Sequence, residues 1–179
     1  MKRLLMAAIF LCSCGAYPVA KTTPQPYSQQ NFTIKVSWDK AWDKLLQYIF
    51  INQYSIRSQF KGESNASVRL ELKNAGVTYI DPKTKNPKDT SALALSQIRY
   101  RPGNRNEVYP VAGNFECVIN LNKTSDNLIY VSVMMDKTCV LTQFWENYYL
   151  EKRHRWPGVE IESSGRLEKT IQQHLESTY

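Results

Sequence analysis

The chain has 179 residues, of which 42% are hydrophobic and 22% are charged, and this supplies enough apolar side chains for the core of one ordinary globular domain. Its 7 glycines and 8 prolines exclude collagen-like and low-complexity chains. The formal net charge of +7 permits contact with anionic partners, but the basic residues are spread along the chain, which favours solvated surfaces over a nucleic-acid-binding surface.

The first 13 residues have the layout of a secretory signal peptide. Lys2 and Arg3 form a positively charged start, and the apolar run 4–11 is too short to span a bilayer as a helix. Residues 11–14, Leu-Cys-Ser-Cys, resemble the bacterial lipobox, in which small residues precede the cysteine that receives diacylglycerol. This resemblance implies cleavage after residue 13 and lipidation of Cys14.

The residues after Cys14 indicate a location and a tether. Two or three acyl chains anchor a protein stably, whereas one chain gives only marginal membrane binding. Gly15 stands where lipoproteins retained in the inner membrane often carry Asp, so the resemblance implies an outer-membrane lipoprotein that faces the periplasm. Residues 14–31 are rich in Pro, Gln, Thr and Ser and predict an acylated, flexible tether. We expect residues 32–179 to form one α+β periplasmic domain.

A strand and a helix are predicted at the start of this domain. Residues 32–36 alternate between apolar and polar side chains, as a half-buried strand does, and Ser37 is a plausible N-cap. Over residues 38–51, apolar side chains fall on one helical face, with Lys44 among the polar ones on the other. That face holds Trp38, Ala41, Trp42, Leu45, Leu46, Ile49 and Phe50. We expect both tryptophans to be core residues.

The next predicted elements are strands and loops. Residues 54–57 and 68–73 alternate on either side of a turn at 61–65, which predicts a hairpin. Polar segments predict loops over 80–90 and 101–113, and a strand is expected at the end of 91–100.

Three alternating segments, 115–121, 128–135 and 138–145, predict an antiparallel meander with turns at 123–127 and 136–137. An even pair of cysteines in an oxidising compartment, Cys117 and Cys139, suggests one disulfide. The simplest register places Cys117 opposite Val133 and brings Val140, not Cys139, beside Val133. The disulfide therefore requires a bulge, and the alternative is two buried thiols.

The chain ends in a predicted amphipathic helix. Ser163 or Ser164 is the expected N-cap, and Leu167, Ile171 and Leu175 recur at four-residue spacing. The predicted fold class is therefore α+β, with an antiparallel sheet packed by a long helix in the N-terminal half and by a C-terminal helix.

This order of elements resembles the helix-grip domains of the outer-membrane-assembly lipoprotein BamC and of other small proteobacterial lipoproteins. Those proteins often end in a serine-threonine-glycine turn followed by a Leu-Glu pair, and residues 163–168 match that pattern with Ser for Thr. Many of them carry a cysteine just before this turn, where this chain has Ile161. The departure leaves Cys117 and Cys139 as the disulfide candidates.

Aromatic and basic residues alternate between positions 144 and 158. Such a segment can contact glycan, lipid phosphate or a protein partner, and the alternative is a strand that runs into a solvated loop. The candidate partner surface consists of Trp145, Tyr148, Tyr149, Lys152, Arg153, Arg155 and Trp156. No zinc-type Cys/His spacing, nucleophile motif or phosphate-binding loop is present, so we assign no metal, cofactor or catalytic residue.

Three functions follow from these patterns, in order of preference. The first is a non-enzymatic scaffold or accessory protein of a cell-envelope complex, bound to the membrane through its acyl chains and to envelope proteins. The second is a periplasmic module that binds lipid or peptidoglycan between the 38–51 helix and the sheet. The third is an envelope hydrolase. An apolar pocket beneath the helix would favour the second, and a filled core with an exposed apolar patch the first. A buried carboxylate or histidine cluster in a cleft would favour the third.

Overall fold

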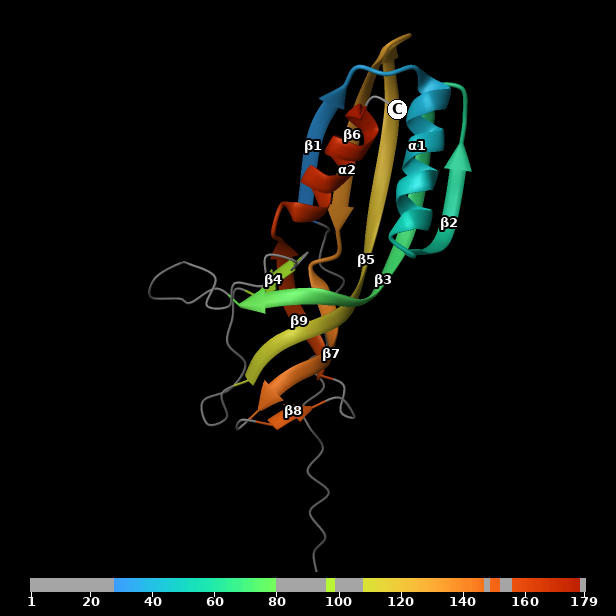
Figure 1. Ribbon diagram of the computed structural model, residues 1–179. Helices are drawn as coiled ribbons and strands as arrows, with labels where there is room; N and C mark the ends of the chain where they lie inside the picture. The colour runs from blue at the N-terminus through green and yellow to red at the C-terminus, as the bar shows by residue number, and fades with distance from the viewer. Residues whose placement is uncertain (1–27, 80–95, 99–107, 147–148, 152–155, 178–179) are drawn as a thin grey trace, which may run out of the picture.

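The computed structural model describes residues 28–79, 96–98, 108–146, 149–151 and 156–177, which form an antiparallel sheet with two helices (Figure 1). In chain order the elements are β1 (Ser28–Ile34), α1 (Trp38–Ile51), β2 (Ser55–Lys61), β3 (Asn65–Tyr79), β4 (Ser96–Ile98), β5 (Val108–Ser125), β6 (Leu128–Met135), β7 (Thr138–Glu146), β8 (Tyr149–Glu151), β9 (Trp156–Ser163) and α2 (Arg166–Glu176). The pairing of β3 with β4 is parallel, and every other strand pairing in these ranges is antiparallel.

Two long strands, β3 and β5, pair with each other and organise the sheet. Along its other edge β3 pairs first with β2 and then with β4, while β5 pairs with β6 and with β7 on its other edge. In the half of the molecule that carries the helices, the strands therefore form an open sheet in the order β1-β6-β5-β3-β2.

In the other half the strands form a closed ring. The pairings run from β5 to β3, β4, β9 and β7 and return to β5, while β8 extends the sheet from β7. Closure removes the unpaired strand edges that would otherwise promote aggregation.

β3 bends where it passes from the open sheet into the ring (Figure 1), and its pairing with β5 shifts register between Leu72 and Ala75, on either side of Asn74. Asn74 has φ = 49°, a left-handed conformation that Asn tolerates better than most residues. Its N–H donates to Asn114 Oδ1 of β5 at 2.9 Å, and its own Oδ1 accepts from Thr142 Oγ1 of β7 at 2.8 Å. Asn74 thus holds three strands together at the bulge.

Both helices cover the same face of the open sheet and contact each other (Figure 1). The predicted apolar positions of α2, Leu167, Ile171 and Leu175, are buried, and Trp38 and Trp42 of α1 are core residues as expected. The inward side chains of β3, β5 and β6 complete one core: Val68, Leu70, Leu72, Cys117, Ile119, Leu121, Ile129, Val131 and Val133.

Helix α1 begins after Ser37 as predicted, although the Ser37 side chain makes no capping hydrogen bond. With 14 residues, α1 has an ordinary length for a globular protein, so the prediction of a long helix is not confirmed. Two of its positions differ from the periodic pattern. Phe50 is 83% exposed because it lies in the last turn, and Lys44 is buried because α2 packs over it.

Several strand boundaries differ from the predictions. β1 begins at Ser28, inside the predicted tether, because its polar residues pair with β6 as an edge strand without needing an apolar face. β5 begins at Val108, within a predicted loop; Pro110 is tolerated there because it lies at a register shift. The hairpin of β2 and β3 and the strand β4 are confirmed, whereas the predicted loop 80–90 lies outside the described residues.

The predicted three-strand meander is only partly correct. β5 and β6 form a hairpin, but Cys117 lies opposite Met135 rather than Val133, because the chain turns at residues 126–127, later than the predicted turn centred on residue 125. β7 does not continue the meander beside β6. It pairs with β5 and β9, since residues 136–137 let the chain continue along the same edge of β5: the N–H of Asp136 donates to the carbonyl of Glu116 at 2.9 Å.

The N-cap of α2 is Gly165, not Ser163 or Ser164. Gly165 has φ = 79°, which favours glycine, and the Ser163 hydroxyl accepts a hydrogen bond from the Gly165 N–H at 2.9 Å. The serines therefore shape the turn before the helix.

Candidate functional site

The lipidation site Cys14 lies outside the described residues, and so does much of the aromatic-basic segment. Of its seven candidate residues, the backbone of Trp145 belongs to β7, that of Tyr149 to β8 and that of Trp156 to β9. Tyr148, Lys152, Arg153 and Arg155 are not among the described residues. The described part of this segment belongs to the ring and to its extension, because β8 pairs with the end of β7 and β9 pairs with the beginning of β7.

Cys117 and Cys139 are free, buried thiols, so the predicted disulfide is not present. The two cysteines have different neighbours: Cys117 pairs with Leu70 and Met135 in the open sheet, whereas Cys139 pairs with Val159 in the ring. Burial raises the pKa of each thiol to about 12, so both stay protonated at neutral pH. Neither has the lowered pKa that marks a reactive cysteine.

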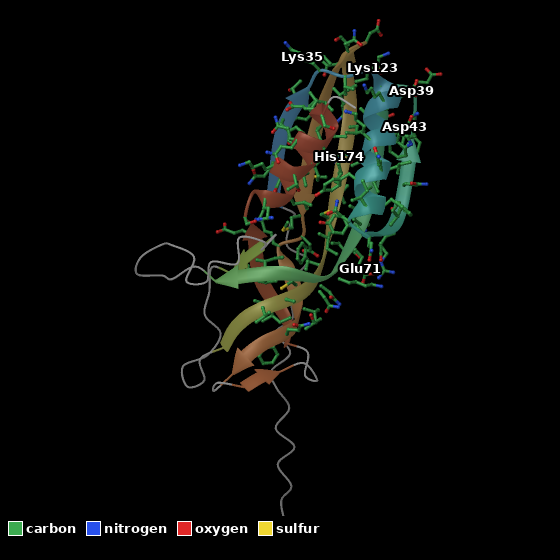
Figure 2. All side chains as sticks on the ribbon, viewed as in Figure 1. Lys35, Asp39, Asp43, Glu71, Lys123 and His174 are labelled. Atoms are coloured by element: carbon green, nitrogen blue, oxygen red, sulfur yellow. The ribbon has the colours of Figure 1, made fainter. Side chains whose placement is uncertain are left out.

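A polar cluster lies between the two helices and the start of β2. The Tyr48 hydroxyl is 2.7 Å from Thr170 Oγ1, and the Tyr48 ring contacts the rings of Tyr54 and His174 at centroid distances of 6.0 and 5.5 Å. His174, labelled in Figure 2, has a buried Nε2 that no described residue pairs with in a hydrogen bond. Burial raises the pKa of both tyrosines, so their phenols remain neutral. The cluster joins α1 to α2.

Glu168 is the most unusual ionisable residue of the core. It lies in the first turn of α2 and is 5% exposed, and neither of its carboxylate oxygens has a hydrogen-bond partner among the described residues. Its charge is the second cause of the raised pKa of Cys117, after burial, so the two side chains are neighbours. The Leu-Glu pair at the start of the C-terminal helix contains this residue, but the sequence gives no indication that its carboxylate is buried.

Exposed apolar side chains gather where α1 ends and β2 begins. Phe50, Ile51 and Ile56 are 83%, 60% and 43% exposed, and we call them the α1–β2 patch. Beneath the same helix, the side chains of Trp42, Leu45 and Ile49 are packed into the core. The apolar exposure thus lies at the end of the helix and not in a groove under it.

A cavity of about 310 Å³ lies on the opposite face of the open sheet, away from the helices. Sequence alternation predicts that this face is polar, but it gives no sign of a cavity. The residues that line it are Phe60, Asn65, Ala66, Ser67, Asn120, Asn122, Tyr130, Ser132 and Met134. The helix-side cluster and this cavity therefore lie on different sides of the sheet.

Among the described residues, no three His, Cys, Asp or Glu side chains are arranged to hold a metal ion, and neither helix is long and apolar enough to cross a membrane. No family model matches the chain, and no curated protein matches it.

Proposed function

We propose that the chain is an outer-membrane lipoprotein, anchored through Cys14 and facing the periplasm, that serves as a non-enzymatic accessory protein in a cell-envelope complex. The observation that carries this proposal is the contrast between the filled core beneath α1 and the exposed α1–β2 patch. Exposed apolar residues with a polar surround are typical of a surface that binds another protein.

The charges near the patch favour a protein partner over an anionic lipid surface. Arg57 of β2 lies 2.8 Å from Glu71, and Lys73 lies 3.4 Å from the same carboxylate (Figure 2 labels Glu71). Asn52 and Gln53, which follow Ile51 in the chain, are uncharged and exposed. Among the described residues, the cation that follows Ile56 in the chain is therefore paired with a carboxylate and is less available to anionic headgroups.

The packing of α1 gives no support to a lipid or peptidoglycan site between helix and sheet, because the side chains facing the sheet fill that space. We also propose that the fold is a variant of the helix grip, supported by two contacting helices on one face of an antiparallel sheet.

Site-specific photocrosslinking in the native host tests the partner. A photoreactive residue at position 50 of the full chain should yield a covalent adduct with a protein, and Ile51→Ser should reduce its yield, because both side chains belong to the patch. The matched control is the same residue at position 60, since Phe60 is 57% exposed on the opposite face of the sheet.

A third arm uses Cys14→Ala, which should move the protein from the membrane to the soluble fraction and abolish the adduct. Absence of a protein adduct at position 50, or an equal adduct at position 60, would contradict the partner surface. Retention of the Cys14→Ala variant in membranes with unchanged mass would contradict the anchor.

A further inference from the structure

The outer-face cavity lies over four neighbouring strands of the open sheet. Strand register places its side chains in two rows that cross the strands. One row runs from Phe60 of β2 through Ser67, Asn120 and Ser132. The second row holds Asn65, Asn122 and Tyr130. Amides and hydroxyls thus lie side by side in register on β3, β5 and β6, with an aromatic ring at one end of each row.

These side chains favour a ligand that both donates and accepts hydrogen bonds. Side-chain amides and hydroxyls do both, and so do sugar hydroxyl and N-acetyl groups. The rings of Phe60 and Tyr130 and the Met134 side chain add apolar contacts, which suit the C–H faces of a pyranose. The site therefore combines hydrogen-bonding groups with apolar surfaces, and a sugar ring presents the same two kinds of group.

The charge of the site favours a neutral ligand. No Asp, Glu, Lys, Arg or His is among the described residues that line the cavity. Beyond it on the same face, Arg69 lies 3.8 Å from Glu116, so these charges compensate each other. A phosphate or polyanion would find no cation in the cavity to bind.

The spacing of the strands distinguishes a glycan from a peptide. Neighbouring strands are about 4.8 Å apart, so each row presents one side chain at about that interval. This interval is close to the length of one pyranose unit in an extended β-linked glycan. An extended peptide repeats at about 3.3 Å per residue and would lose register with the rows. From Phe60 to Ser132 the row spans three intervals, or about 14 Å.

We propose that the outer face of the sheet binds a linear, uncharged, β-linked glycan, laid across β2, β3, β5 and β6 with one sugar unit over each strand. Asn65, Asn120 and Asn122 hydrogen-bond its hydroxyl and N-acetyl groups, and Phe60 and Tyr130 pack on its rings. This site is separate from the α1–β2 patch, so the glycan proposal does not depend on the proposed partner complex.

Titration of the purified full chain with N-acetylglucosamine and its β-1,4-linked dimer, trimer and tetramer, followed by NMR chemical shifts, tests this proposal. Affinity should rise with each added unit up to the tetramer, and the shifts should map to β3, β5 and β6. Asn122→Ala should weaken tetramer binding about two- to tenfold, the loss expected for one hydrogen bond. Phe60→Ala should weaken it similarly. Both residues are exposed, so neither variant should impair folding.

The matched control is Asn127→Ala, which changes the same residue type in the turn after β5, outside the cavity, and should leave affinity unchanged. An uncharged alanine tetrapeptide is the control ligand. Absence of saturable shifts at millimolar tetramer, equal binding by Asn122→Ala, or stronger binding of the peptide at the same residues would each overturn the proposal.

Discussion

Two buried charged side chains on the helices differ in whether they have partners. Lys44 is 8% exposed, and its Nζ donates to the carbonyls of Leu175 and Ser177 at the end of α2. A cation at a helix C-terminus satisfies carbonyls that the helix leaves unpaired. Glu168, in the first turn of the same helix, finds no hydrogen-bond partner for either oxygen in the part of the chain that the structure describes. Lys44 therefore stabilises the pairing of the two helices, whereas Glu168 opposes the packing of α2.

Replacement of Glu168 by Met should stabilise the protein. Met has a similar length and high helix propensity, and it removes two buried, unpaired oxygens. The loss of a negative charge near a helix N-terminus offsets part of the gain. We expect the free energy of unfolding to rise by about 1–2 kcal/mol in urea denaturation.

The control for this substitution is Lys169→Met, at an exposed position of the same helix, which should change stability by less than about 0.5 kcal/mol. A lower stability of Glu168→Met would show that the carboxylate has a stabilising role that its surroundings in the fold do not reveal.

At the scale of elements, closure of the ring depends on close approach of β5 and β7 at Gly113. A Cβ atom there would lie 3.1 Å from the Val140 carbonyl oxygen, 3.2 Å from Cys139 Sγ and 3.4 Å from Val77 Cγ2. Contacts this short are tighter than ordinary packing, and Gly113 is buried between β3 and β7. The glycine is thus required by space.

Gly113→Ala should lower the free energy of unfolding by about 1–3 kcal/mol, the usual cost of overpacking. If the Cys139 sulfur is one of the atoms that must move, Cys139→Ala should relieve part of that cost. The double variant should then lose less stability than the sum of the two single variants in denaturant unfolding. Strictly additive losses would show that the sulfur does not restrict this position.

Elements with regular side-chain periodicity could be predicted from the sequence, and the pairing of strands could not. Spacing identified α1, α2 and the β2–β3 hairpin, because burial of one face imposes a period. The direction of β7 depends on residues 136–137. The Asp-Lys sequence there is compatible with a turn, but the chain instead continues along β5. The parallel pairing of β4 and the edge pairing of Ser28 rest on tertiary contacts without a local pattern.

The candidate sites were less accessible to prediction than the fold. Cys117 and Cys139 were correctly placed on strands, but whether they pair depends on the course of β7, which runs beside β5 with Val140 opposite Asn114 and not beside β6. The burial of Glu168 depends on how α2 docks. The outer-face cavity arises from side chains brought together by four strands, so alternation within one strand cannot reveal it.

For the whole molecule, the buried acids predict that stability falls at alkaline pH. The pKa of Cys117 and that of Cys139 rise from 9.0 to about 12 on folding, chiefly through burial. Below about pH 9 both states keep these protons; between about pH 9 and 12 the unfolded chain releases them and the folded protein does not. Each thiol should then lower the free energy of unfolding by up to about 1.4 kcal/mol per pH unit.

Urea unfolding measured from pH 8 to about pH 11 checks this dependence. The double variant with Cys117→Ala and Cys139→Ala should lose stability with a shallower slope than the wild type, whatever its stability at pH 8. Tyr48 and Tyr54, whose pKa values are also raised by burial, should maintain a residual slope. Identical slopes for the two proteins would show that the thiols ionise equally in both states.

The hydrogen bonds of Asn74 have a mechanical consequence. β3 and β5 pass without interruption from the open sheet into the ring, and Asn74 ties β3 to Asn114 and to Thr142 at the bend. These hydrogen bonds restrict bending of β3 at the bulge. Tension applied to one end of the molecule would pass along two continuous backbones to the other. We therefore expect the helix-covered sheet and the ring to keep their relative orientation and to move as one body under force.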